Sequence, residues 1–137
     1  MSVDTPTGRL ILDTGGLLAW AQGDAKARGV IQDAARRRLL IVVPAVVIAQ
    51  AIRGGSRDAA VNWALNRIDK QLPVTPALAR QAGALLGVTG ATDVVDAIVV
   101  AEALRVLPAA ILTSDPRDLH VLVAADPARG RVRIVTI

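Results

Sequence analysis

Cysteine, phenylalanine and tyrosine are absent from this sequence, and tryptophan occurs only twice. Without cysteine the chain has neither a disulfide framework nor a zinc–thiolate site, which fits a cytoplasmic protein. Because phenylalanine and tyrosine are missing, the core must be built from aliphatic side chains. The longest apolar runs are far shorter than the roughly 20 residues needed to cross a bilayer. The sequence therefore predicts no association with a membrane.

The chain begins without the charged start, apolar run and small-residue cleavage site of a signal peptide, so none is predicted. Residues 1–8 are polar, and we expect them to be frayed. The total of 137 residues, 53% of them hydrophobic, suits one domain with a substantial core. We find no internal repeat, low-complexity tract or long linker. The expected organisation is a single domain over residues 1–137.

One residue type dominates among the basic residues and another among the acidic residues. The chain has 16 basic and 12 acidic residues, a formal net charge of +4. All the basic residues except Lys26 and Lys70 are arginine, which suits bidentate contacts with phosphate. A high-GC coding sequence would favour arginine, alanine and valine as well. The acidic side is more informative, because every acidic residue except Glu102 is aspartate.

Short apolar runs alternate with longer segments of helical pattern along the chain. Strands are predicted over residues 10–12, 39–43, 71–74, 110–113 and 132–137. Helices are predicted over residues 17–22, 24–38, 44–53, 57–68, 75–87 and 93–107, and through 121 and 122. Ser56 is expected to cap the helix over 57–68, and Trp63 within that helix is expected in the core. Strands that alternate with helices indicate a layered α/β fold with a mostly parallel sheet and right-handed crossovers.

The first predicted strand ends abruptly at Asp13, and Gly15-Gly16 follow at once. A carboxylate here lies at the carboxyl end of a buried parallel strand, where ligands gather in open α/β sheets. Asp13 is equally suited to capping the next helix. The two glycines are interpreted as turning the chain away from Asp13.

Two more aspartates occupy related places. Asp115 follows the fourth predicted strand, and Asp96 lies in the first turn of the helix before that strand. If the first and fourth strands are neighbours, the three carboxylates Asp13, Asp96 and Asp115 meet at one edge of the sheet. Like charges held together repel unless a proton or cation intervenes. Oxygen ligands alone favour a hard divalent ion, Mg²⁺ or Mn²⁺.

Such an ion can activate water and stabilise charge on a phosphodiester, so no side-chain nucleophile is required. This suits a chain without cysteine whose lone histidine, His120, is expected to be structural or exposed. Asp93 and Asp118 are candidates for a supporting role. Each is also placed to serve its own helix, Asp93 as the cap and Asp118 as an early residue.

The ordered set of Asp13-Thr14, Val95-Asp96-Ala97-Ile98 and Thr113-Ser114-Asp115 resembles the PIN-domain ribonucleases, and among them the VapC toxins of toxin–antitoxin pairs. The resemblance covers nearly the whole chain. It implies a PIN-like three-layer α/β/α fold with a five-stranded sheet of order 3-2-1-4-5. It also implies an endoribonuclease dependent on Mg²⁺ or Mn²⁺, a homodimer, and a VapB-type antitoxin that blocks the site. Thr14 then becomes a supporting residue whose hydroxyl holds a carboxylate or a bound water.

One position departs from that family. Its members usually place a glutamate in the helix after the second strand, where this chain has Gln50. An amide oxygen can still touch a metal but carries no charge, so weaker metal binding is expected. Glu102 cannot replace the missing acid, since it lies about 240° around the helix from Asp96. A PIN-fold module that binds RNA or an antitoxin with little or no catalysis is therefore the alternative.

Other α/β families fit less well. A receiver domain needs a lysine late in the chain, and none follows Lys70. Asp13-Thr14-Gly15 does not match the Asp-x-Asp-x-Thr motif of haloacid-dehalogenase phosphatases, and no dinucleotide fingerprint is present.

RNA contact is assigned to arginines close in sequence to the site: Arg53, Arg57 and Arg117. An arginine in such a place is more often simply a solvated surface residue. Base stacking is limited because the only aromatic rings besides His120 are Trp20 and Trp63. Trp20 could face the core, a dimer partner or an antitoxin.

Overall fold

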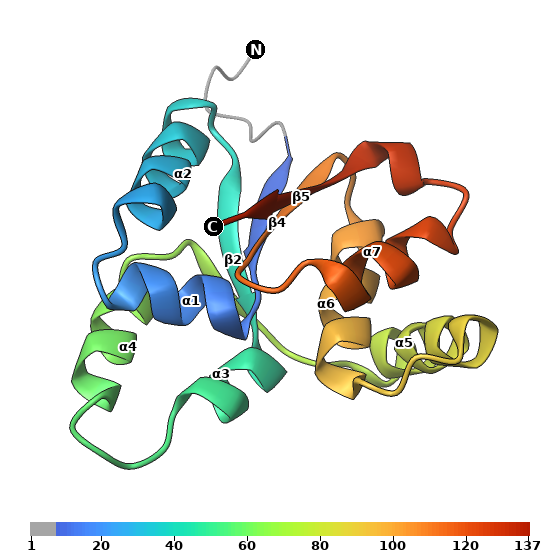
Figure 1. Ribbon diagram of the computed structural model, residues 1–137, viewed down its shortest axis with the longest axis horizontal. Helices are drawn as coiled ribbons and strands as arrows, with labels where there is room; N and C mark the ends of the chain where they lie inside the picture. The colour runs from blue at the N-terminus through green and yellow to red at the C-terminus, as the bar shows by residue number, and fades with distance from the viewer. Residues whose placement is uncertain (1–7) are drawn as a thin grey trace.

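The computed structural model describes residues 8–137, and its centre is a sheet of five parallel strands in the order β3-β2-β1-β4-β5 (Figure 1). The strands are β1 (Arg9–Leu12), β2 (Leu40–Pro44), β3 (Lys70–Leu72), β4 (Ala109–Thr113) and β5 (Val132–Thr136). Every pairing is parallel, so the expectation of a mostly parallel sheet of this order is confirmed. All five carboxyl ends consequently lie at one edge.

Seven α-helices within the described residues complete the fold, with a short 3₁₀ turn (Arg129–Arg131) before β5. They are α1 (Thr14–Ala21), α2 (Ala25–Arg36), α3 (Ala45–Ala51), α4 (Asp58–Leu65), α5 (Pro76–Thr89), α6 (Val94–Arg105) and α7 (Arg117–Ala124). Helices α1, α2 and α4 lie on one side of the sheet, and α5, α6 and α7 lie on the other (Figure 1). The result is the expected three-layer α/β/α arrangement.

The core is aliphatic, as the missing aromatic residues require. Both central strands are buried along their whole length, β1 through Leu10, Ile11 and Leu12 and β4 through Ile111 and Leu112. Strands buried on both faces read as continuous apolar runs rather than alternating ones, which is why the sequence predicted them well. In the described part of the chain no single helix is long and apolar enough to span a membrane. Only α5 and α6 taken together reach that length, and they are bent by 113° at their break.

The glycine pair after Asp13 does not turn the chain away, and the prediction of a helix starting at residue 17 is wrong. Helix α1 begins at Thr14, directly after Asp13, and contains both glycines in its first turn. A Cβ on Gly16 would lie 2.3 Å from the backbone carbonyl oxygen of Leu112, and one on Gly15 would lie 2.1 Å from the hydroxyl of Ser114. The glycines therefore let the first turn of α1 lie directly against the end of β4.

Two further expectations, the cap by Ser56 and the burial of Trp63, are wrong. Helix α4 begins at Asp58 without a side-chain cap from Ser56, and the Asp58 carboxylate instead accepts hydrogen bonds from the backbone N–H groups of Arg53 and Gly54. Trp63 is 44% exposed, because its ring packs edge-on against buried Trp20 at the surface rather than entering the core.

The expected frayed segment over residues 1–8 falls, apart from Gly8, outside the described residues. Gly8 itself is buried, and its carbonyl accepts a hydrogen bond from the N–H of Leu40, so at this residue the expectation does not hold.

The close approach of α1 to β4 predicts opposite effects for one substitution at two helical glycines. Gly16→Ala should lower the free energy of unfolding by about 1–3 kcal/mol, since the rigid Leu112 carbonyl cannot move aside. Gly29→Ala in α2 meets nothing within 4 Å and should raise it by up to about 1 kcal/mol through helix propensity. Urea unfolding of both variants measures this. Equal effects at the two positions would contradict the steric account.

Candidate active site

Asp13 joins the end of β1 to the start of α1 and serves two purposes at once. Its Oδ1 accepts a hydrogen bond of 2.8 Å from the N–H of Gly16, so it caps α1, and the side chain is 7% exposed. Burial raises the pKa of Asp13 above its ordinary value, and the charge of Asp115 raises it further. Hydrogen bonds from the Thr113 hydroxyl and the N–H of Gly16 act in the opposite direction. Capping and a place at the carboxyl edge are thus compatible in this residue.

Thr113 links Asp13 to Asp115, and the sequence reasoning did not single it out. It is the last residue of β4 and is fully buried. Its side chain hydrogen-bonds to Asp13, and its hydroxyl oxygen accepts a hydrogen bond of 3.0 Å from the N–H of Asp115. A polar residue that ends an otherwise apolar strand, directly before Ser114-Asp115, was the signal that could have identified it.

Two further carboxylates lie at the start of α6. Asp93 caps the helix, because its Oδ1 accepts a hydrogen bond of 3.0 Å from the N–H of Asp96. Asp96 is half-buried, and its pKa is raised to about 7, first by burial and then by the charges of Asp93, Asp13, Asp118 and Asp115. The five aspartates therefore act on one another electrostatically, and we call them the aspartate cluster.

The aspartate cluster suits a cation by chemistry and charge. Its donors are carboxylate oxygens, the ligands that Mg²⁺ and Mn²⁺ prefer, and a cation would relieve the repulsion that raises the pKa of Asp96. Among residues 8–137, however, no three acidic or histidine side chains are arranged closely enough to coordinate an ion as they stand. Asp93, Asp115 and Asp118 are exposed, so their rotamers can change readily. The charges are brought together, whereas a coordination shell is not preformed.

Gln50 is hydrogen-bonded to Thr14, the residue that follows Asp13 in the chain. The Thr14 hydroxyl donates a hydrogen bond to the amide oxygen of Gln50, which lies near the end of α3 and is exposed. The predicted contact of Thr14 with a carboxylate is thus replaced by one with an amide. A glutamate at position 50 could accept the same hydrogen bond and would add a negative charge beside Asp13.

The other residues considered from the sequence are three arginines, the lone histidine and Glu102. Arg53 and Arg57 are exposed in the connection from α3 to α4, and Arg117 is exposed at the start of α7, between Asp115 and Asp118. His120 is exposed on α7, as expected. Glu102 is buried and pairs with Arg9, so its exclusion from the site is consistent with the structure.

Comparisons with known proteins give a result for the structure alone. No family model and no curated protein sequence matches this chain. Its structure is similar to a chain in the crystal structure of VapBC2 from Rickettsia felis bound to a DNA fragment from their promoter. The TM-score is 0.66 at 12% sequence identity, and the match covers 93% of this chain and 98% of that chain. At this identity the likeness establishes the architecture and leaves the chemistry to the residues.

The chain has a PIN-like fold. The likeness extends over almost all of both chains, so the match is not confined to the sheet. Within that fold the aspartate cluster occupies the carboxyl edge of the sheet, with β1, β4 and α6 each contributing one of the three aspartates Asp13, Asp115 and Asp96.

The aspartate cluster predicts a stability that depends on pH. The pKa of Asp96 in the folded protein, about 7, lies above the ordinary value of 3.8 for an aspartate. The stability that Asp96 contributes is therefore fully present below about pH 4 and is lost as the pH rises through 7. Asp96→Asn should therefore raise the free energy of unfolding at pH 8 by about 1–2 kcal/mol, after discounting for solvent screening. Denaturant unfolding with a chelator present, at pH 8 and pH 4.5, measures the difference.

The gain should shrink towards zero at pH 4.5, where wild-type Asp96 is protonated. Asp33→Asn, at an exposed ion pair with Arg37, is the control and should gain nothing at pH 8. If Asp96→Asn instead lowers the free energy of unfolding at pH 8, the neighbouring carboxylates do not repel the Asp96 carboxylate.

Proposed function

We propose that this protein is a metal-dependent endoribonuclease and the toxin component of a type II toxin–antitoxin pair. The observation that carries the proposal is the aspartate cluster, in which four other carboxylates help to raise the pKa of Asp96. Acidic side chains that are crowded at the carboxyl edge of a parallel sheet repel one another, and a bound cation would relieve this repulsion. The VapBC2 similarity supports the toxin–antitoxin part.

Asp13, Asp96 and Asp115 are the residues that would hold Mg²⁺ or Mn²⁺. When bound, such an ion lowers the pKa of a coordinated water and stabilises negative charge on a phosphodiester. The chain itself fixes the acids: Asp13 by the Gly16 N–H and the Thr113 hydroxyl, and Asp96 by the helix that Asp93 caps. Asp118 adds negative charge from α7. Because Asp13 is buried and bonded on two sides, it is the most constrained of the three.

Gln50 favours a second candidate function. At the position where the resembling ribonucleases carry glutamate, this chain presents a neutral amide bonded to Thr14. One acidic ligand fewer weakens attraction for a divalent ion. A PIN-fold module that binds RNA or an antitoxin, with weak or no catalysis, is therefore the alternative, and measurable cleavage is what separates the two.

The partners follow from the same proposal. RNA is the substrate, and its phosphates are contacted by exposed arginines: Arg117, between Asp115 and Asp118 in the chain, and Arg53 and Arg57, which follow α3. A cognate VapB-type antitoxin and a homodimer complete the proposed assembly, in the cytoplasm. The T-shaped pair of Trp20 and Trp63, with Arg67 4.0 Å from the Trp63 ring centroid, is a surface feature available to a protein partner.

Cleavage of total cellular RNA by the purified protein tests the proposal. Activity should require Mg²⁺ or Mn²⁺, vanish with a chelator, and fall at least about a hundredfold in Asp13→Asn and in Asp96→Asn, because each removes a proposed ligand. Asp33→Asn, at the exposed ion pair with Arg37, should retain full activity. RNA binding by the wild type without any cleavage would support the binding module instead.

Position 50 gives an independent prediction. Gln50→Glu should raise the affinity for Mn²⁺ and the cleavage rate, each by roughly tenfold, because it adds a negative charge next to Thr14 while keeping the hydrogen bond from the Thr14 hydroxyl. Gln50→Ala should leave metal affinity near the wild-type value. Titration calorimetry with Mn²⁺ and a rate assay measure the two quantities. Unchanged affinity in Gln50→Glu would place Gln50 outside the metal's ligands.

A further inference from the structure

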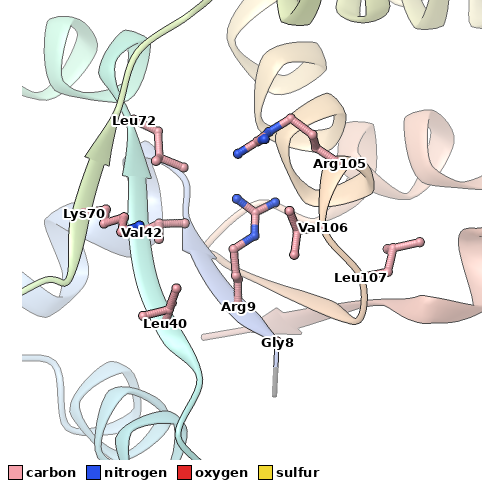
Figure 2. Close-up of a pocket in the computed structure, with 9 residues that line it drawn as sticks. All are labelled: Gly8, Arg9, Leu40, Val42, Lys70, Leu72, Arg105, Val106 and Leu107. Atoms are coloured by element: carbon pink, nitrogen blue, oxygen red, sulfur yellow. The ribbon is translucent and has the colours of Figure 1, made fainter. Parts of the chain in front are cut away.

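A second polar site lies at the opposite, amino edge of the sheet. It is a pocket of about 510 Å³ under β1, β2 and β3, closed on one side by the end of α6 (Figure 2). Its lining alternates along the strands, as one face of a sheet requires: Arg9 from β1, Leu40 and Val42 from β2, Lys70 and Leu72 from β3. A pocket of this size is in the range that holds a small organic molecule.

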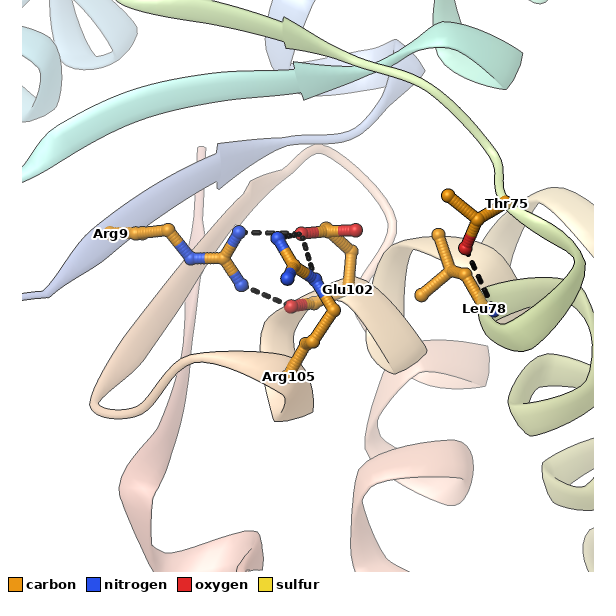
Figure 3. A network of polar contacts seen from close by, with 5 residues as sticks. All are labelled: Arg9, Thr75, Leu78, Glu102 and Arg105. Carbon is orange, nitrogen blue, oxygen red and sulfur yellow. Dashed lines mark hydrogen bonds and ion pairs between the residues drawn. The ribbon is translucent and has the colours of Figure 1, made fainter.

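Two guanidinium groups of the pocket lining, those of Arg9 and Arg105, share the carboxylate of Glu102 (Figure 3). Arg9 and Arg105 both contact Oε1 of Glu102, at 2.5 Å from Nη1 of Arg9 and 3.0 Å from Nη2 of Arg105. Arg9 also donates to the backbone carbonyl of Glu102. Arg9 and Glu102 are 5% and 2% exposed, so the pair is buried. One carboxylate balances one guanidinium, which leaves a positive charge in excess.

Arg9 is also incompletely bonded. Its Nε–H is buried and has no hydrogen-bond partner in the described part of the chain. A buried donor without an acceptor is unfavourable, and the penalty is greater for a charged group. Arg9 lies in the pocket wall, and in Figure 2 its guanidinium group and that of Arg105 face the same space. An acceptor oxygen that enters the pocket would meet the exposed guanidinium group of Arg105, close to the positive charge of buried Arg9.

The rest of the pocket lining adds one more cation and an apolar wall. Lys70 adds a third cation, and within residues 8–137 Glu102 is the one acid that pairs with these cations. Leu40, Val42, Leu72, Val106 and Leu107 form the apolar part of the wall. Three cations against one acid, beside an aliphatic surface, suit an anion that carries an apolar group and exclude a cation.

We propose that this pocket binds a small organic anion, a phosphate or carboxylate joined to an apolar body. The charged group contacts Arg105 and Lys70 above buried Arg9, and the apolar body lies on Leu40, Val42 and Leu72. The site is separate from the aspartate cluster, because the pocket is at the strand starts and the cluster is at the strand ends. The proposal therefore stands whether or not the protein cleaves RNA.

Titration of the full chain with phenyl phosphate, followed by backbone amide NMR, tests the proposal. Phenyl phosphate and benzoate each carry an anionic group and an apolar ring, and they distinguish phosphate from carboxylate. Saturable shifts are expected at Gly8, Leu40, Lys70 and Val106, with amides of the aspartate cluster unmoved. Inorganic phosphate should bind the same amides more weakly, and benzyl alcohol should not bind, because each lacks one half of the ligand.

Variants at exposed cations keep the fold intact for the comparison. Arg105→Gln and Lys70→Gln should each weaken phenyl phosphate binding by about tenfold, the loss expected for one charge-assisted hydrogen bond. Arg80→Gln on α5 removes an equal charge at an exposed position outside the pocket and should change affinity less than twofold. Arg9→Met is not used, because it would remove the buried partner of Glu102, whereas replacing exposed Arg105 leaves the buried ion pair of Arg9 with Glu102 in place.

Three results would overturn the proposal. Shifts absent from the four pocket amides would show that the pocket does not bind these anions. Equal weakening by Arg80→Gln and Arg105→Gln would reduce the effect to net charge. Shifts of the same amides by an RNA oligonucleotide, but by neither phenyl phosphate nor benzoate, would assign the basic edge to a nucleic-acid backbone instead.

Discussion

The structure depends on the close parallel pairing of β1 with β4 and on the helix that starts where β1 ends. The N–H of Asp13 donates to the carbonyl of Leu112, which carries the pairing one residue beyond the strand. Gly16 then passes so near the same carbonyl that no side chain fits between them. Two segments nearly one hundred residues apart in sequence are held together by this contact, and it brings Asp13 beside Thr113 and Asp115.

Much of the fold could be predicted because the central strands are buried on both faces. Continuous aliphatic runs such as Leu10–Leu12 and Ala110–Thr113 carry a clear signal, and Asp24 and Asp93 mark their helix starts as capping rules predict. The exposure of Trp63 could not be predicted from the sequence in this way. Its hydrophobicity favours the core, but its exposure is decided by Trp20 and Arg67, contacts between helices that no local pattern reveals.

The sequence predicted which aspartates the candidate site brings together better than it predicted how their neighbours pack. Asp13, Asp96 and Asp115 follow from strand ends and helix starts, positions that parallel topology brings to one edge. The part played by Gly15 and Gly16 was misread, because a glycine needed for close packing has the same sequence signature as one needed for a turn. Thr113 was overlooked because a single threonine ending an apolar strand is ordinary until its partner across the sheet is known.

The two edges of the sheet carry opposite charge. Aspartates gather at the carboxyl edge, and at the amino edge Arg9 and Arg105 share one carboxylate beside Lys70. On the other side of Arg9, a second cavity of about 360 Å³ is lined by Arg131 and Arg133 among other residues. Five of the 12 acidic residues thus belong to the aspartate cluster, in a chain whose formal net charge is +4.

The central claim is that the carboxyl edge is a single site for a divalent cation, and paramagnetic broadening by Mn²⁺ tests it most directly. Amide spectra recorded with substoichiometric Mn²⁺ should lose intensity first around Asp13, Asp96 and Asp115, with Lys70 and Val106 at the opposite edge unaffected. The broadening should be reversed by excess Mg²⁺. Weak broadening spread over acids outside the aspartate cluster, Asp33 and Asp126 included, would contradict the account.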